Sequence, residues 1–315
     1  MPDTGAQPAA PSSHTFPPHL ASLLVGVTVG WGLNWPAMKI VLAEMAPLHF
    51  RTLVLGLGAA GLFFIAWAGG FAFRVPAGQW GRLVAIALFT MSGWNIFAIY
   101  GIGLLASGRA AILGYTMPAW SVLLSALLLH EPLTRRRILG VALGGGGMLL
   151  LLGNEIQALG RSPAGALLMI AAAFCWALGA VLMKRWPVDL PATSFTAWQI
   201  LIGVVPIVAF ALLFERGSFN AFTLSAWPMG ALAYNILAYD FCYWAWTKIV
   251  TLAPVGVASL AIMMVPVVGV FSGMLLLGEA PHWQDYAALV LVVASLATVL
   301  RPAKAAGVAP VSQPD

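Results

Sequence analysis

Ten apolar stretches run along this chain, and each is close to the length that a helix needs to cross a lipid bilayer, about 20 residues. Short polar connections separate them and leave no room for a separate soluble domain. The stretches cover approximately residues 20–43, 48–69, 80–101, 105–129, 135–153, 163–184, 192–214, 226–249, 253–277 and 282–300. Because a spanning helix satisfies its own backbone hydrogen bonds in lipid, the sequence predicts an all-α polytopic membrane protein with ten transmembrane helices.

The charge content excludes a soluble protein of this size. Only 8% of the 315 residues are charged, whereas soluble proteins carry about 25%. The longest basic run, residues 135–137, separates two apolar stretches, although nucleic-acid binding needs Lys and Arg clustered on one face. We therefore expect the lipid bilayer as a partner, and no nucleic acid.

Two segments that lie 148 residues apart are similar to each other. The first, YTMPAWSVLLSALLLHE, ends at Glu131, and the second, MMVPVVGVFSGMLLLGE, ends at Glu279. Pro118 and Pro266 occupy the same place in the two segments. The chain therefore contains an internal repeat that pairs the fourth apolar stretch with the ninth.

A second match supports this repeat. WGLNWPAMK, which ends at Lys39, is similar to WALGAVLMK, which ends at Lys184. The predicted organisation is a disordered tail at 1–19, a first half at 20–153, a second half at 163–300 and a C-terminal tail at 301–315.

Each half contains five predicted helices, and five is an odd number, so the second half enters the membrane in the opposite orientation. Two inverted five-helix repeats are typical of secondary transporters that alternate between two open states. Pro118 and Pro266 each remove one backbone hydrogen bond and kink a helix. Their matched positions predict hinges, and static kinks are the alternative.

The distribution of Lys and Arg predicts the orientation in the membrane. With ten spans both termini lie on one side, and that side would carry ten Lys and Arg residues against five on the other. Because cytoplasmic connections are enriched in Lys and Arg, we expect both termini in the cytoplasm. Residues 1–18 contain no Lys or Arg, so a signal peptide is not expected.

Residue patterns for catalysis are missing from the sequence. It contains no Cys/His pattern with metal-ligand spacing, no Gly-x-Ser-x-Gly segment and no phosphate-binding loop. We therefore expect no enzyme, no metal and no cofactor. Gly140 and Gly144 have a spacing that permits close helix contact, within one chain or in a homodimer, so a monomer and a homodimer both stay open.

Polar residues inside the apolar stretches are candidates for a binding site, because a polar group at mid-membrane depth usually faces a cavity or a partner. Asp240 is the one carboxylate predicted deep in a stretch, and it either binds a proton or an ammonium group or is structural. Asn34 either binds a zwitterion through its amide or bonds a neighbouring helix beside Pro36. The residues predicted to line a substrate cavity are Asn34, Trp94, Asn95, Tyr100, Tyr115, Tyr239, Asp240 and Tyr243.

Two further polar residues, His49 and Arg51, lie at the start of the second stretch. A cation at this place could attract a carboxylate. The favoured interpretation is that both residues are interfacial.

The repeated Pro and Glu residues, with HEP at 130–132 and GEA at 278–280, resemble the EamA-type branch of the drug/metabolite transporter superfamily. The resemblance covers about residues 20–300 and implies ten helices in two inverted halves, located in the bacterial inner (plasma) membrane. The aromatic content is similar to that of the YddG-type exporters. This similarity implies a small-molecule substrate that is a neutral amino acid, aromatic ones included, or a similar metabolite.

Three other functions compete with amino-acid export. Small multidrug exporters of the same superfamily carry cationic drugs with a Glu in their first helix, whereas the first stretch here has no acid before Glu44. A membrane-embedded lipid-modifying enzyme needs His, Ser or paired acids at mid-membrane depth, where the sequence offers only Asp240. A passive channel is compatible with the repeat, and counterflow kinetics would distinguish it from a carrier.

Overall fold

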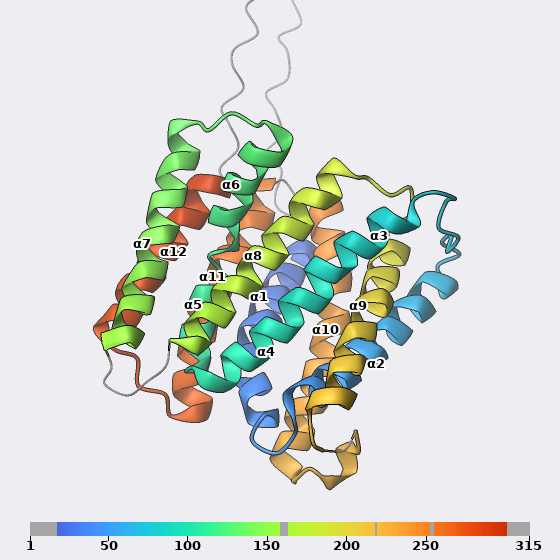
Figure 1. The fold of residues 1–315 in the computed structure, drawn as a ribbon, viewed down its shortest axis with the longest axis horizontal. Coiled ribbons are helices and arrows are strands. Elements are labelled where there is room, and N and C mark those ends of the chain that lie inside the picture. The colour runs from blue at the N-terminus through green and yellow to red at the C-terminus, as the bar shows by residue number, and fades with distance from the viewer. Residues whose placement is uncertain (1–17, 158–162, 218, 253–254, 301–315) are drawn as a thin grey trace, which may run out of the picture.

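The computed structural model describes residues 18–157, 163–217, 219–252 and 255–300 (Figure 1). The tails predicted at 1–19 and 301–315 lie outside these ranges, except for residues 18 and 19, which begin the first helix. Within the described ranges every regular element is helical. The elements are α1 (Pro18–Val41), α2 (Pro47–Ala68), α3 (Trp80–Ala87), the π-helical η1 (Leu88–Gly93), α4 (Trp94–Leu104), α5 (Ser107–Gly114), α6 (Met117–Leu129), α7 (Arg135–Gln157), α8 (Ala164–Arg185), α9 (Ala192–Phe214), the 3₁₀-helical η2 (Ala221–Thr223), α10 (Ala226–Leu252), α11 (Val255–Leu277) and α12 (Trp283–Leu300).

The helices occupy the predicted apolar stretches, with ends shifted by a few residues, and the all-helical class is confirmed. The third stretch consists of α3, η1 and α4 in direct succession, and the fourth consists of α5 and α6 with a break between them. Among the described residues, five helical stretches are long and apolar enough to cross a membrane. They are Pro47–Ala68, Trp80–Leu104, Ser107–Leu129, Ala164–Arg185 and Ala192–Phe214. The number of ten crossings stays a prediction.

The two halves of the sequence pack against each other along their whole length. α1 lies along α10 and α11, α2 along α9, α4 along α8, and α7 along α12 (Figure 1). In every one of these pairs, one helix comes from residues 20–153 and the other from residues 163–300. The largest fully buried side chains also come from both halves, for example Phe50, Ile112 and Ile200. The main hydrophobic core therefore lies between the halves.

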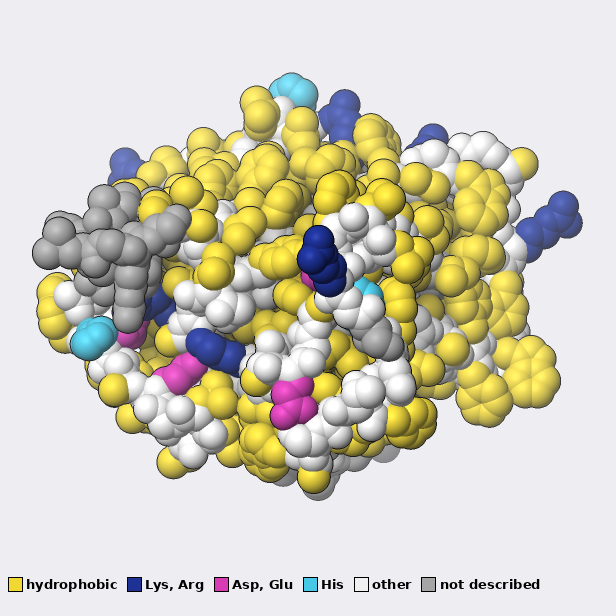
Figure 2. Space-filling view, turned by 60° about the horizontal axis from the view of Figure 1, so that its bottom comes forward, with side chains coloured by type: hydrophobic (Ala, Val, Ile, Leu, Met, Phe, Trp, Pro, Cys, Tyr) yellow, Lys and Arg dark blue, Asp and Glu magenta, His cyan; other side chains and the backbone are white. Residues whose placement is uncertain are grey.

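Large hydrophobic side chains cover the outside of the helices. Figure 2 shows hydrophobic side chains over most of the visible surface, with few charged ones among them. Leu213 and Phe214 on α9 are 75% and 71% exposed, and Leu275 on α11 is 85% exposed. In water, apolar surface of this extent would drive association, whereas a lipid bilayer covers it without such a cost.

Three glutamates at one end of the molecule connect the halves. Each glutamate follows the C-terminal end of a helix in one half and accepts a hydrogen bond from the N-terminal end of a helix in the other. The backbone hydrogen bonds are Ser225 N–H to Glu44 at 2.7 Å, Leu48 N–H to Glu215 at 2.9 Å and Ser107 N–H to Glu279 at 2.6 Å. Helix N-termini carry free N–H groups and a partial positive charge, so carboxylates stabilise them.

The two repeated prolines have different local structures. Pro118 is the second residue of α6, directly after the break at residues 115 and 116. Pro266 lies inside α11, which continues through it. A proline is tolerated in the first turn of a helix but removes a hydrogen bond in its interior. Before Pro118 the α-helix is interrupted for two residues, 115 and 116, which form a turn, and the hinge role of both prolines stays a prediction.

The small-residue segment of α7 packs within the chain. Ser295 of α12 donates a hydrogen bond from its Oγ to the carbonyl oxygen of Gly140, at 2.6 Å. A Cβ atom at Gly144 would lie only 3.0 Å from that Oγ and 3.1 Å from the Cβ of Ala119. The glycines thus allow α7 to approach both α12 and α6 closely.

Candidate functional site

A small cavity of about 130 Å³ lies among α1, α2, α4, α8 and α10, beside the break between α5 and α6. The residues that line it are Trp31, Asn34, Trp35, Met38, Arg51, Trp94, Asn95, Ala98, Ile99, Ile102, Tyr115, Met117, Trp176, Tyr239 and Tyr243. Both halves of the sequence contribute to this cavity, which we call the central cavity.

Seven of the fifteen residues that line the central cavity are aromatic. The rings of Trp94 and Trp176 meet edge to face with their centroids 5.3 Å apart. Those of Tyr239 and Tyr243 lie 4.6 Å apart on one face of α10. Aromatic pairs in such arrangements hold each other in fixed orientations. The cavity therefore offers rigid, mostly apolar surfaces to a molecule inside it.

Arg51 provides a positive charge at the central cavity. Its side chain comes from the first turns of α2, and the residue is only 5% exposed. The Nε atom donates to the Oδ1 atom of Asn95 at 2.8 Å, and Nη2 donates to the same oxygen. The Nδ2 atom of Asn95 donates to the carbonyl oxygen of Met91 at 2.7 Å, which holds the amide oxygen toward Arg51.

The guanidinium has no acidic partner among the described residues. All of its polar contacts there are with Asn95, except that Nη1 lies 3.5 Å from the sulfur of Met38. A thioether sulfur is a weak acceptor. A buried charge is costly unless a counter-ion or several hydrogen bonds compensate it. The central cavity is therefore suited to a molecule that carries an anionic group.

His49 and Arg51 are both buried inside the protein, and their predicted place at the membrane interface stays a prediction. His49 is 2% exposed, and its Nδ1 atom lies 2.9 Å from the Oε2 atom of Glu215. The hydroxyl group of Tyr100 donates to the other oxygen of Glu215 at 2.7 Å. This group of side chains joins α2 and α4 to the end of α9.

The structure brings six of the predicted site residues together. Those that line the central cavity are Asn34, Trp94, Asn95, Tyr115, Tyr239 and Tyr243. Tyr100 does not line it, because its hydroxyl group is bonded to Glu215.

Asp240 also lies outside the central cavity. Successive residues of a helix point about 100° apart, so Asp240 does not share the helix face of Tyr239 and Tyr243. Its side chain is directed at α2. Its carboxylate lies against the glycines of that helix, and a Cβ atom at Gly61 would come within 2.5 Å of its Oδ2 atom. Its Oδ1 atom is buried and has no hydrogen-bond partner in the part of the chain that the structure describes.

The prediction missed several residues of the central cavity, above all Arg51 and the rings of Trp31, Trp35 and Trp176. The signal for Arg51 was present, since it is a lone cation in the first turns of an apolar helix that also contains His49. For Trp31 and Trp176, the signal was their matched place in the repeat.

A family comparison agrees with this architecture. The model of the EamA-like transporter family matches the chain twice, over residues 20–153 and over residues 163–301. The chain belongs to the EamA-like transporter family. It is thus a multi-pass membrane protein, and the resemblance seen in the repeated Pro and Glu residues is confirmed.

Several relatives of this EamA-like transporter are named as transporters or efflux pumps. It is 28% identical over 258 residues to an uncharacterized transporter, YoaV, of Bacillus subtilis. This alignment covers 81% of this chain and 88% of YoaV. It is 27% identical over 283 residues to a probable amino-acid metabolite efflux pump of Salmonella typhimurium, over 86% of this chain and 91% of that one. A solved crystal structure is similar to this chain with a TM-score of 0.63 and 20% sequence identity. The match covers 90% of this chain and 96% of the chain in that crystal structure, which shows the shared fold.

Proposed function

We propose that this EamA-like transporter exports neutral amino acids, aromatic ones among them, or similar small metabolites. The observation that carries the proposal is Arg51, a buried cation without a carboxylate partner among the described residues, in a cavity walled by aromatic rings. The carboxylate of the substrate binds the guanidinium, and its apolar side chain packs between the rings. The name of the Salmonella typhimurium relative supports this class of substrate.

The chemistry of the Arg51 guanidinium and of a carboxylate favours their pairing. A guanidinium presents its N–H groups in a planar fork that fits a carboxylate, and the pair is stronger where water is excluded. Asn34 and the hydroxyl groups of Tyr239 and Tyr243 line the same cavity and can accept hydrogen bonds from an ammonium group. The rings can also stabilise that ammonium through cation–π contact.

The charge of the central cavity opposes the export of cationic drugs. Its charged lining residue is Arg51, which repels a cation. A lipid-modifying enzyme is opposed by the names of the relatives and by Asp240, which lies outside the cavity.

The transport mechanism is alternating access between two inverted halves of five transmembrane helices each, at residues 20–153 and 163–300. The cavity is built from both halves, so a relative movement of the halves opens it to one side and closes it to the other. Pro118 and Pro266 act as hinges at matched places. The protein lies in the bacterial inner membrane with both termini in the cytoplasm, as a monomer or a homodimer.

The test is the uptake of labelled phenylalanine, tryptophan, threonine and methionine into liposomes that contain the purified protein, with and without a pH gradient. Saturable uptake with trans-acceleration establishes a carrier, because a pore shows neither property. Uptake driven by the gradient adds proton coupling, with Asp240 as the first candidate site, and uptake that ignores it indicates facilitated transport. The absence of uptake for all four amino acids would refute amino-acid export.

A further inference from the structure

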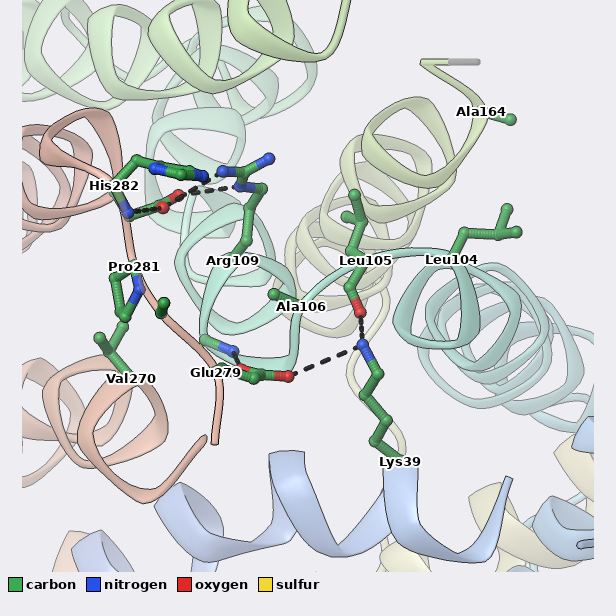
Figure 3. Close-up of a pocket in the computed structure, with 13 residues that line it drawn as sticks. Lys39, Leu104, Leu105, Ala106, Arg109, Ala164, Val270, Glu279, Pro281 and His282 are labelled. Carbon is green, nitrogen blue, oxygen red and sulfur yellow. Dashed lines mark hydrogen bonds and ion pairs between the residues drawn. The ribbon is translucent and has the colours of Figure 1, made fainter. Parts of the chain in front are cut away.

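A second and larger cavity, of about 610 Å³, lies at the end of the molecule that the three glutamate caps occupy, and Glu279 is one of its lining residues. We call it the outer cavity. Its charged lining residues are Lys39, Arg109, Glu279 and Asp285. Figure 3 shows Lys39 on α1 extending toward the connection between α4 and α5, where Leu105 and Glu279 meet it.

The two cavities follow each other along the same helices without sharing a residue. On α1, Trp35 lines the central cavity and Lys39 lines the outer one. Residues four apart lie on one helix face, about 6 Å apart along the axis. On α4, Ile102 lines the central cavity, and Leu105, directly after the helix, lines the outer one. The two cavities are therefore neighbours along α1 and α4.

Two of the four charged residues of the outer cavity are firmly paired with each other. Arg109 donates to Asp285 through Nε at 2.8 Å and through Nη2 at 3.2 Å. Asp285 also accepts a hydrogen bond from the backbone N–H of His282 at 2.8 Å. A two-point pair of this kind is strong and fixes the geometry of both groups.

Glu279 is held mainly by the start of α5. It accepts from the backbone N–H of Ser107 at 2.6 Å, from the Oγ atom of Ser107 at 2.9 Å and from the backbone N–H of Gly108 at 3.2 Å. These bonds satisfy the carboxylate at a helix N-terminus, where a negative charge is favoured. Glu279 therefore does not depend on Lys39.

Lys39 is held more loosely than the other charges of the outer cavity. Its Nζ atom lies 3.6 Å from the Oε1 atom of Glu279, whereas a charge-assisted hydrogen bond measures about 2.7–2.9 Å. Its hydrogen bond goes to the carbonyl oxygen of Leu105, a neutral acceptor. The side chain is 31% exposed. An entering carboxylate can therefore bind Lys39 while Glu279 keeps its own hydrogen bonds.

The matched lysine at the other end of the molecule is bound differently. Lys184, which occupies the place of Lys39 in the repeat, donates to Glu131. Arg137 pairs with the second oxygen of Glu131 at 2.9 Å. The hydrogen bond from Lys184, together with the charges of both cations, lowers the pKa of Glu131. Lys184 thus belongs to an established ion pair and makes a matched control for Lys39.

We propose that the outer cavity is a second binding site for the transported substrate, in which Lys39 binds the carboxylate after it has left Arg51. This inference rests on the proposed export of neutral amino acids. The substrate thereby moves between two cations on one path and does not cross the apolar wall as an unpaired anion.

The experiment is equilibrium binding of labelled phenylalanine to the purified full-length protein, with the number of bound molecules per chain as the readout. The parent protein should bind two molecules, and Lys39→Gln should bind one. Lys39→Arg, which keeps the charge, should restore the second molecule, and Lys184→Gln should bind two. Arg51→Gln should lose the central site and keep the outer one, and phenethylamine, which has no carboxylate, should not compete at the outer site.

Three other outcomes would overturn the second site, and they can be told apart. One bound molecule in the parent protein, lost in Arg51→Gln and unchanged in Lys39→Gln, would overturn the second site and leave the proposed function intact. Equal losses in Lys39→Gln and Lys184→Gln would assign Lys39 a structural role and overturn the inference. No binding of phenylalanine to the parent protein would refute the proposed function and this inference with it.

Discussion

Replacing Arg51 by Gln should separate substrate binding from folding. In the structure Arg51 donates to the amide oxygen of Asn95, and its Nη1 atom reaches only the sulfur of Met38 at 3.5 Å. A Gln amide can still donate to Asn95, but it offers no charge to a carboxylate. The variant therefore keeps part of the internal hydrogen bonding and loses the anion site.

The expected size of the effect follows from these contacts. A hydrogen bond to a charged group contributes about 1.5–3 kcal/mol, and each 1.4 kcal/mol changes affinity about tenfold. Arg51→Gln should thus raise the dissociation constant for phenylalanine about 10–150-fold. Gln can replace the hydrogen bond from Nε to Asn95, and the bond from Nη2 is lost. A bond from a charged donor contributes about 1.5–3 kcal/mol, but removing the buried charge also removes its desolvation cost, so the free energy of unfolding should fall by less than about 3 kcal/mol.

Both quantities can be measured on the same detergent-purified samples, by binding of labelled phenylalanine and by thermal unfolding. Arg51→Lys keeps the charge without the planar fork, so its affinity should fall between those of the parent and Arg51→Gln. Arg136→Gln removes the same charge from an exposed position at the start of α7 and should change neither quantity. An unchanged affinity in Arg51→Gln, or a parallel loss of affinity and stability, would refute the reasoning.

Three further predictions concern the surroundings of the central cavity. Asn95→Asp places a carboxylate against Arg51, so it should weaken phenylalanine binding about as much as Arg51→Gln does; unchanged affinity would show that the substrate carboxylate binds elsewhere. Asp240→Asn should leave the affinity unchanged, because Asp240 does not line the cavity, and should abolish any acceleration of uptake by a pH gradient; a retained response would exclude Asp240 as the proton site. Pro118→Ala and Pro266→Ala should slow counterflow more than they weaken binding, whereas unchanged turnover would identify both as static kinks.

The helices could be predicted from the sequence because each apolar stretch carries its own signal. A helix in lipid satisfies its backbone hydrogen bonds internally, so length and hydropathy suffice to locate it. The break between α5 and α6 could not be located in this way. Pro118 only shows that one hydrogen bond is missing, and whether a helix bends or stops there depends on the side chains packed around it.

Residues of the central cavity could be predicted from the sequence when their spacing fixes the direction of their side chains. Tyr239 and Tyr243 are four residues apart and share a helix face, so finding one in the cavity places the other. Arg51 could not be placed, because an arginine one turn into a helix can extend to the membrane surface or turn inward. What turns it inward here is Asn95, whose position in another helix the sequence does not reveal.

Contacts between the two halves of the chain are the feature that the sequence predicts least well. Glu215 reaches His49 across 166 positions of the chain, and no local pattern connects them. The repeat, in contrast, could be found by comparing the sequence with itself, because its residues recur at a fixed distance.

Matched residues of the repeat have different partners at the two ends of the molecule. Glu279 is bound by the start of α5 and leaves Lys39 loosely held, whereas Glu131 is bound by two cations, Lys184 and Arg137. A carrier that alternates between two states needs such a difference, because one end must release its contacts while the other keeps them. If the halves exchange these arrangements during transport, Lys184 becomes the loosely held lysine in the other state and binds the carboxylate at the other end of the path. Lys184→Gln should then impair transport measured from that end, although it leaves binding in the present state unchanged.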